Sequence, residues 1–237
     1  MSGWRAVAFD LDDTLYPERE YVLSGFRAVA AWAHTNLNIP AEKGVDSLSR
    51  LFSEGVRGDT FNRWLFLHQV EPKASLIDKL VHIYRSHEPK IKPFPEVPTL
   101  LSTLKKKYRL GLISDGHLSV QQSKLNALHL ASFFDAIVLS DEWGRDYWKP
   151  STRPFEIILG KLGVEGKDAV YVGDNPLKDF LGARRLGMTA VWVRRPGGEY
   201  SHLTPPSHAH APHSIFSSLF QLVSHLKVPP DCWNACF

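Results

Sequence analysis

The segment VAFDLDDTLY (residues 7–16) joins an apolar run to three closely spaced carboxylates. The apolar run at residues 6–9 has the character of a buried strand. Asp10, Asp12 and Asp13 follow at once. Their mutual repulsion and partial desolvation are costly at the end of such a strand. A bound cation, or chemistry that uses the carboxylates, would explain this placement.

Short apolar, β-branched runs recur along the chain, and helical stretches of about a dozen residues separate most of them. The predicted strands are residues 6–9, 110–113, 136–139, 169–172 and 189–193. This alternation predicts an α/β fold, namely a doubly wound, Rossmann-like parallel sheet with helices on both faces. Ligands of such folds bind at the carboxyl ends of the strands.

One long segment, from about residue 20 to 87, breaks this alternation. Its apolar residues recur at helical spacing and no strand-like run separates them. A Pro-rich stretch then leads the chain back to the sheet. We therefore predict a helical cap inserted after the first strand. The predicted domains are an α/β catalytic core of residues 1–17 and 92–237 and a helical cap of residues 18–91.

The composition narrows the class of partner. The 237 residues suffice for a sizeable core, and the formal net charge is only +3. Lys and Arg are scattered along the chain, without the basic stripe of a nucleic-acid-binding surface. We see neither a membrane-spanning segment nor the pattern of a secretory signal. These features predict a soluble, cytoplasmic protein that binds a small anionic molecule, with no nucleic-acid or membrane partner, and they leave its oligomeric state open.

Two further groups of residues contain types that commonly bind metal ions, namely Cys and His. Two thiols alone, Cys232 and Cys236, make neither a four-ligand zinc site nor a disulfide framework, so we interpret them as tail residues. Four histidines lie in a Pro- and Ser-rich stretch, which we interpret as a loop. These histidines are His202, His208, His210 and His213.

Polar clusters follow the predicted strands. The segment DLDDT follows the first strand, and LISDGH, DYWKP and YVGDNPLKDF come at or after the later ones. They contribute Asp10, Asp12, Ser114, Asp115, Gly116, Lys149, Asp174 and Asp179. Because the carboxyl ends of parallel strands share one edge of a sheet, we expect these residues to converge there.

These residue types suit phosphoryl transfer. A phosphomonoester carries nearly two negative charges, so an anionic nucleophile cannot approach it unless cations screen the repulsion. Asp10 and Asp174 form a suitable pair of Mg²⁺ ligands. Lys149 would add a point charge beside the phosphate. We therefore predict Mg²⁺ as the cofactor.

The remaining phosphate oxygens need neutral donors. The hydroxyl group of Ser114 and the backbone N–H groups near Asp115 and Gly116 would supply them. The sequence thus predicts a small phosphorylated substrate.

The ordered motifs DLDDT, ISDG, Lys-Pro before a helix and GDNPLKD resemble those of the haloacid dehalogenase superfamily of hydrolases, over roughly residues 5–193. The resemblance implies a helical cap after the first motif. It also implies a magnesium-dependent phosphatase that hydrolyses a small phosphorylated metabolite through an aspartyl-phosphate intermediate. A sugar phosphate, a sugar-acid phosphate and a nucleotide all remain open as substrates.

By the same resemblance, Asp10 is the nucleophile and a metal ligand. Asp12 protonates the leaving alcohol, then deprotonates the attacking water, and its backbone carbonyl helps to hold the metal. Asp174 is the acidic metal ligand. These roles require Asp10 to stay ionised and Asp12 to hold a proton, so their environments must separate the two pKa values.

The resemblance also assigns the phosphate-binding residues. Ser114 and Lys149 bind phosphate, and Asp179 orders either the water shell of the metal or Lys149. In place of Asp115 many members of the superfamily have Asn. That difference puts an additional negative charge near the phosphate.

Three other functions are weighed against this one. Haloacid dehalogenation uses a similar aspartate nucleophile but needs neither the acid at Asp12 nor the metal ligand at Asp174. A phosphomutase would have to protect its aspartyl phosphate from water. A receiver-type module that accepts phosphate without turnover is typically shorter and has no helical cap.

Overall fold

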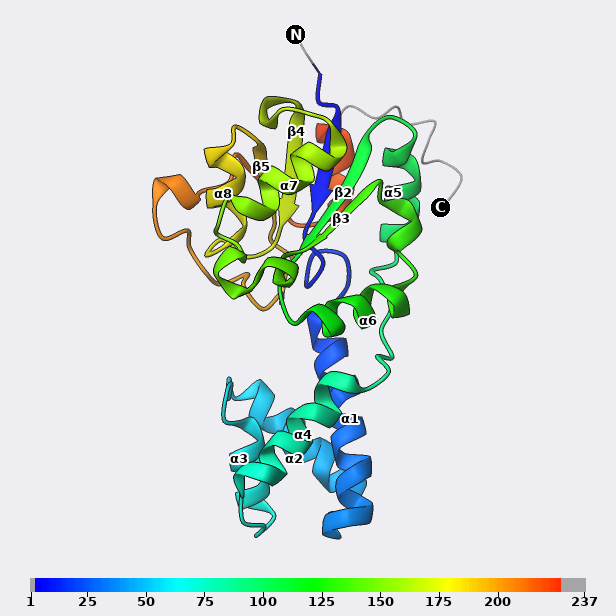
Figure 1. Cartoon of the computed structure of the whole chain (residues 1–237), viewed down its shortest axis with the longest axis vertical. Coiled ribbons are helices and arrows are strands. Elements are labelled where there is room, and N and C mark those ends of the chain that lie inside the picture. The colour runs from blue at the N-terminus through cyan, green and yellow to red at the C-terminus, as the bar shows by residue number, and fades with distance from the viewer. Residues whose placement is uncertain (1–2, 227–237) are drawn as a thin grey trace. The chain divides into compact units, whose positions relative to one another are not determined.

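β1 (Ala6–Phe9) lies in the interior of a six-stranded parallel sheet in this computed structural model, which describes residues 3–226 (Figure 1). The strand order is β3-β2-β1-β4-β5-β6. The other strands are β2 (Arg109–Ser114), β3 (Ala136–Leu139), β4 (Ala169–Gly173), β5 (Thr189–Val193) and β6 (Ser214–Phe216). The predicted α/β fold is confirmed, and β6 is an additional strand that the sequence pattern did not predict.

The register of the sheet brings the ends of its central strands level. Phe9 of β1 pairs with Leu112 of β2 and with Val172 of β4. The N–H group of Asp10 donates to the carbonyl oxygen of Val172 at 2.8 Å, so the ladder extends one residue past β1. The residues that follow these three strands therefore emerge side by side at one edge.

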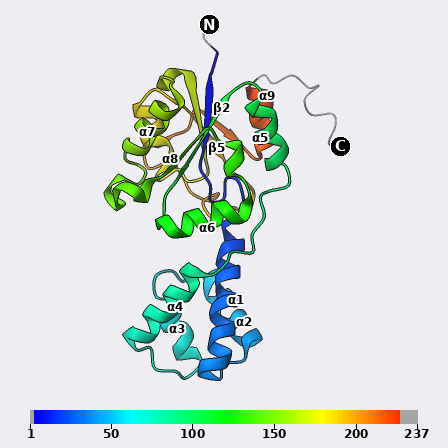
Figure 2. The ribbon, with the colours of Figure 1, turned by 45° about the vertical axis from the view of Figure 1, so that its right-hand side comes forward.

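Helices cover both faces of the sheet. α7 (Arg153–Leu162) and α8 (Asp179–Arg185) pack on one face, whereas α5 (Val97–Lys105) and α9 (Leu219–His225) pack on the other (Figures 1 and 2). α6 (Leu118–Leu128) connects β2 to β3. The short 3-10 helices are η1 (Ala131–Phe133), η2 (Ser140–Trp143), η3 (Arg145–Tyr147), η4 (Gly166–Asp168) and η5 (His208–His210).

The core between the sheet and α7 is tightly packed. Phe155 and Ile158 of α7 are fully buried against Ala8 of β1 and Tyr171 of β4. Burial of such side chains stabilises the fold by about 1.5–3 kcal/mol each. A Cβ atom at Gly111 of β2 would lie 2.8 Å from Ile158, so the absence of a side chain there lets α7 approach the sheet.

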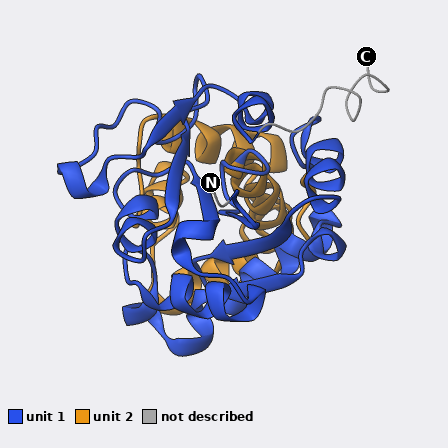
Figure 3. Cartoon of the chain, turned by 90° about the horizontal axis from the view of Figure 1, so that it is seen from above, with its two compact units in different colours: residues 1–17, 92–237 blue, residues 18–91 orange. Residues whose placement is uncertain are grey.

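The chain divides into two units, residues 1–17 with 92–237 and residues 18–91 (Figure 3). The second unit is all helical, and it consists of α1 (Glu18–Leu37), α2 (Ala41–Ser53), α3 (Thr60–Leu67) and α4 (Ala74–Ser86). Its own core contains the fully buried side chains of Leu48, Trp64 and Leu80. Among the helices of residues 3–226, none combines the length and the apolar character needed to span a membrane.

The histidine-containing stretch docks on the sheet. The N–H group of Ala190 in β5 donates to Nδ1 of His213 at 2.9 Å, and the N–H group of His213 donates back to the carbonyl oxygen of Ala190 at 2.8 Å. Within the described part of the chain, no His belongs to a group of three metal-ligating side chains. Cys232 and Cys236 lie outside the described residues.

Candidate active site

Lys149 joins the polar side chains at the carboxyl edge of the sheet. Its side chain is fully buried and its ammonium group donates to Asp10 Oδ1, to Asp179 Oδ1 at 2.7 Å and to the Tyr171 hydroxyl at 2.9 Å. Burial alone would lower the pKa of Lys149, but Asp10 and Asp179 outweigh it and raise that pKa well above its ordinary value. Lys149 is therefore a permanent positive charge beside Asp10.

Three buried carboxylates lie together at this edge. Asp10, Asp174 and Asp179 each offer an oxygen within 4.8 Å of the other two. Burial raises the pKa of Asp10 to about 7, against the attraction of Lys149. Burial, with Asp179 and Asp10 nearby, also raises the pKa of Asp174 well above its ordinary value. The negative charge at Asp174 is thus poorly compensated, as expected of a ligand for a divalent cation.

The contacts of Asp179 set it apart from the other two carboxylates. Its Oδ2 accepts hydrogen bonds from the N–H groups of Asp174 at 3.1 Å and Asn175 at 2.8 Å. Its Oδ1 accepts one from the ammonium group of Lys149. Burial would raise the pKa of Asp179, but Lys149 and then Lys178 hold it below its ordinary value. Asp179 therefore orients Lys149 and the loop after β4, and Asp10 and Asp174 are left as the carboxylates that fit Mg²⁺.

Gly173 makes room for Asp179. A Cβ atom at this last residue of β4 would lie 2.6 Å from Asp179 Oδ2 and 2.9 Å from Asp179 Cβ. Such distances are far inside van der Waals contact. The glycine in the GDNPLKD motif is therefore needed for Asp179 to fold back against the strand end.

Asp12 lies two residues after Asp10 and has hydrogen-bond partners of its own. Its Oδ1 accepts hydrogen bonds from the Lys124 ammonium group at 2.7 Å and from the Tyr16 hydroxyl group. Its Oδ2 accepts a hydrogen bond from Gln121 Nε2 at 3.1 Å. Burial would raise the pKa of Asp12, but the Lys124 charge, its hydrogen bond and that of Tyr16 hold the pKa below its ordinary value. Both carboxylate oxygens of Asp12 are thus occupied by donors.

Ser114 is the last residue of β2, and Asp115 and Gly116 follow it. Ser114 Oγ is buried and has no hydrogen-bond partner among the described residues. Asp115 Oδ1 accepts the N–H group of Lys149 at 3.3 Å. Gly116 has φ +124°, and a Cβ atom there would lie 2.4 Å from Gln121 Nε2. A side chain at Gly116 would therefore displace Gln121, which also donates to the Asp115 carbonyl oxygen at 2.5 Å.

The structure places all eight predicted site residues at or just after the ends of β1, β2 and β4, in the loop before α7 and at the start of α8. It also adds Tyr171, Gln121, Lys124 and Lys178, which the motifs did not single out. Lys124 and Gln121 are both 3% exposed, although both are polar residues on a helix. The signal in the sequence was the spacing of Lys124 four residues after Val120 and four before Leu128, which is the spacing of one helix face.

Removal of the Lys124 charge is expected to destabilise the protein. Lys124→Met leaves the Asp12 carboxylate without its cation, and loss of one partner of a buried ion pair costs about 3–5 kcal/mol. Asp12 keeps Tyr16 and Gln121 as hydrogen-bond donors, so we expect a loss at the lower end of this range. The free energy of unfolding, measured with urea, should fall by about 3 kcal/mol. The double variant Lys124→Met/Asp12→Asn should recover part of this loss, and equal stabilities of both variants would contradict the ion-pair argument.

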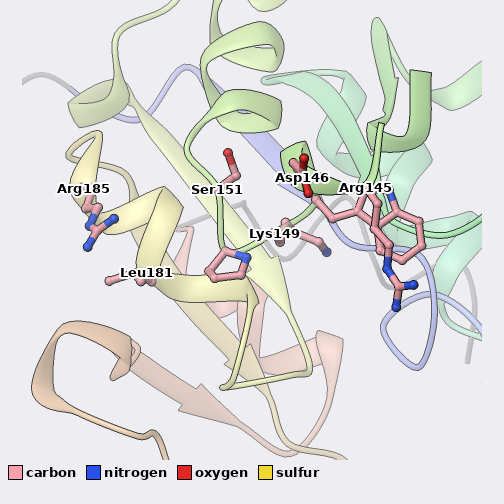
Figure 4. Close-up of a pocket in the computed structure, with 8 residues that line it drawn as sticks. Arg145, Asp146, Lys149, Ser151, Leu181 and Arg185 are labelled. Atoms are coloured by element: carbon pink, nitrogen blue, oxygen red, sulfur yellow. The ribbon is translucent and has the colours of Figure 1, made fainter. Parts of the chain in front are cut away.

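A separate pocket of about 520 Å³ lies beside the segment that carries Lys149. Figure 4 shows Arg145 and Arg185 on opposite sides of Lys149 in this view. Neither Asp10 nor Asp174 lines the pocket, so it is not part of the carboxylate cluster. The lining residues labelled in Figure 4 are Arg145, Asp146, Lys149, Ser151, Leu181 and Arg185.

A doubly wound sheet with buried carboxylates around a lysine at its carboxyl edge is the arrangement expected of a hydrolase that acts at the strand ends. The chain belongs to the haloacid dehalogenase-like hydrolase family, whose family model matches residues 7–193. The family that the motifs predicted is thereby confirmed.

Individual relatives cover most of the chain. A glyceraldehyde 3-phosphate phosphatase of Methanopyrus kandleri is 34% identical over 211 residues, which are 85% of this chain and 88% of that protein. Among solved structures, a HAD phosphatase of Thermococcus onnurineus has a TM-score of 0.61 and 25% identity, covering 94% of this chain and 98% of that one. A 2-haloacid dehalogenase of Pseudomonas syringae has a TM-score of 0.64 and 26% identity, with coverages of 94% and 98%.

Proposed function

We propose that this protein is a magnesium-dependent phosphatase that hydrolyses a small phosphorylated sugar through an aspartyl-phosphate intermediate. The observation that carries the proposal is the meeting of Asp10, Lys149 and Asp174 at the carboxyl edge of the sheet. A nucleophile for phosphorus, a fixed positive charge and a metal ligand are the parts that phosphoryl transfer needs.

The relatives support the class of substrate. The Methanopyrus kandleri protein, with a phosphorylated three-carbon sugar in its name, matches over 85% of this chain. A second glyceraldehyde 3-phosphate phosphatase, from Methanothermobacter thermautotrophicus, is 36% identical over 80% of the chain. We therefore propose phosphorylated three-carbon sugars and sugar acids as the first substrates to test.

The metal ligands in this proposal are the carboxylates of Asp10 and Asp174 and the backbone carbonyl of Asp12. Bound there, Mg²⁺ would supply positive charge to the phosphate oxygens and to the Asp10 carboxylate. The raised pKa values of Asp10 and Asp174 support this ligand set. Burial is their main cause and neighbouring carboxylates add to it, and a bound cation would stabilise both ionised forms. Asp179 holds the loop that presents Asp174.

The residues then act in two steps. In the first, a carboxylate oxygen of Asp10 attacks phosphorus, the phosphorus–oxygen bond to the alcohol breaks, and Asp12 gives its proton to the departing oxygen. In the second, Asp12 takes a proton from water, and the water oxygen attacks the phosphorus of the aspartyl phosphate. The Asp10 carboxylate is released together with inorganic phosphate. Ser114 Oγ, buried and without a partner among the described residues, is suited to donate to a phosphate oxygen in both steps.

A phosphate-release screen tests the proposal. We expect the purified protein to release inorganic phosphate from phosphorylated three-carbon compounds in the presence of Mg²⁺, and to lose this activity with EDTA and regain it when Mg²⁺ is added back. The same preparation should release no chloride from 2-chloropropionate, the kind of substrate that a haloacid dehalogenase would take. Chloride release that is insensitive to EDTA, without phosphate release, would replace the phosphatase by the dehalogenase.

A further inference from the structure

We propose that Lys178 is a second phosphate-binding lysine, whose ammonium group contacts the phosphoryl group of the bound substrate. This inference rests on the proposed phosphatase function and adds a specific contact to it. Lys178 lies in the GDNPLKD motif, directly before α8. The family motifs gave it no role in the sequence-based assignment.

The Lys149 ammonium group has no hydrogen-bond donor to spare. An ammonium group has three protons. In the structure they have three acceptors, Asp10 Oδ1, the Tyr171 hydroxyl and Asp179 Oδ1, and the Lys149 side chain is fully buried. A phosphate oxygen could gain a hydrogen bond from Lys149 only by displacing one of these acceptors. Lys149 therefore serves first to hold Asp10 and Asp179.

The Lys178 side chain links the loops that follow β4 and β2. Its ammonium group lies 3.7 Å from Asp115 Oδ2, which follows β2, whereas Lys178 itself follows β4. β1 lies between β2 and β4 in the sheet, and Asp10 is the residue at its end. A side chain that reaches from the loop after β4 to Asp115 after β2 spans the end of β1, where Asp10 lies, and Asp10 is among the charges that act on Lys178.

The Lys178 ammonium group can still donate a hydrogen bond. Its distance to Asp115 Oδ2 is too long for a hydrogen bond, and that oxygen has no hydrogen-bond partner among the described residues. The Lys178 side chain is 31% exposed, in contrast to Lys149. Burial opposes the Lys178 charge, but the neighbouring carboxylates, Asp10 first among them, raise its pKa above the ordinary value. Lys178 thus offers a charged, accessible donor next to the nucleophile.

Lys178→Met tests the contact, because it keeps the length of the side chain and removes its charge. The readouts are KM for two phosphate esters with unrelated alcohols and the inhibition constant of inorganic phosphate. We expect both KM values and the inhibition constant to rise together by about 10- to 100-fold, the loss of one charge-assisted hydrogen bond. Lys178→Arg should restore most of the affinity, and Lys167→Met, at a surface lysine paired with Glu165, should change none of these constants by more than about twofold.

Two results would overturn the inference. One is a change of KM for a single ester with an unchanged inhibition constant, which would mean that Lys178 contacts the alcohol. The other is full recovery of phosphate affinity in Lys178→Met/Asp115→Asn, which would mean that Lys178 only compensates the Asp115 charge. If Lys178→Met does not fold, as judged by circular dichroism, Lys178→Gln is measured with the same expectations. A wild-type protein that hydrolyses no phosphate ester would refute the proposed function itself, whereas active wild-type protein with unaffected Lys178 variants would refute this inference alone.

Discussion

Asp10→Asn is expected to abolish the covalent phosphoenzyme and all measurable turnover. The carboxamide has no anionic oxygen with which to attack phosphorus, so the first step of the proposed reaction has no nucleophile. The measurement is the intact mass of protein quenched with acid during turnover of a good substrate. Wild-type protein should gain the mass of one phosphoryl group, and Asp10→Asn should gain none.

The matched control is Asp13→Asn, three residues further along the same loop. Asp13 is partly exposed and has φ +50°, a conformation that Asn tolerates well, so this variant should keep both the phosphoenzyme and turnover. Phosphoenzyme formation by Asp10→Asn would place the nucleophile elsewhere.

The Asp10→Asn variant should not owe its inactivity to unfolding. Because burial raises the pKa of Asp10 to about 7, the ionised carboxylate is disfavoured in the folded, metal-free protein. A raised carboxyl pKa reduces stability as the pH rises from the unfolded pKa to the folded one. We therefore expect metal-free Asp10→Asn to melt at the same temperature as wild-type protein or higher, at pH 7.5 or above. The proposed reaction therefore requires an ionised carboxylate whose ionisation lowers the stability of the metal-free protein.

Strand ends were predictable from the sequence, whereas contacts made by helices were not. Asp10, Ser114 and Asp174 each follow an apolar run, and parallel strands align their carboxyl ends, so a local pattern sufficed to place them together. Lys124 comes from the side of α6, and which neighbour a helix residue meets depends on how the helix packs. β6 escaped prediction because a three-residue strand with no fully buried side chain has no clear pattern.

The pKa values of Asp10 and Asp12 differ, but in the direction opposite to the one that their proposed catalytic roles require. The structure raises the pKa of Asp10 through burial and lowers that of Asp12, mainly through Lys124. A divalent ion bound by Asp10 would lower the pKa of Asp10, which restores the required ionisation of the nucleophile. For Asp12 the reversal needs movement, because its proton can be held only if the carboxyl group leaves Lys124 or Tyr16. The lowered pKa in the structure corresponds to an ionised Asp12, the form that the proposed second step requires.

Asp12→Ala is expected to lower kcat/KM for an alkyl phosphate by about 10²- to 10⁴-fold, the usual contribution of a general acid. For 4-nitrophenyl phosphate the loss should be far smaller, because nitrophenolate departs without a proton. kcat/KM is the right constant, since it reports the steps up to the first phosphoryl transfer and excludes hydrolysis of the intermediate. The substitution keeps the backbone carbonyl of Asp12, so that proposed metal ligand is retained.

The role of Lys124 follows from the same pair of esters. If Lys124 acts on the reaction through Asp12, Lys124→Met should change the ratio of the two kcat/KM values in the wild-type background and leave it unchanged in Asp12→Ala. Equal losses for both esters in Asp12→Ala would show that the carboxyl group supports the fold of the loop or the metal and does not protonate the leaving group. In that case the acid must be another group at the sheet edge, and the two-step assignment for Asp12 fails while Asp10 keeps its role as the nucleophile.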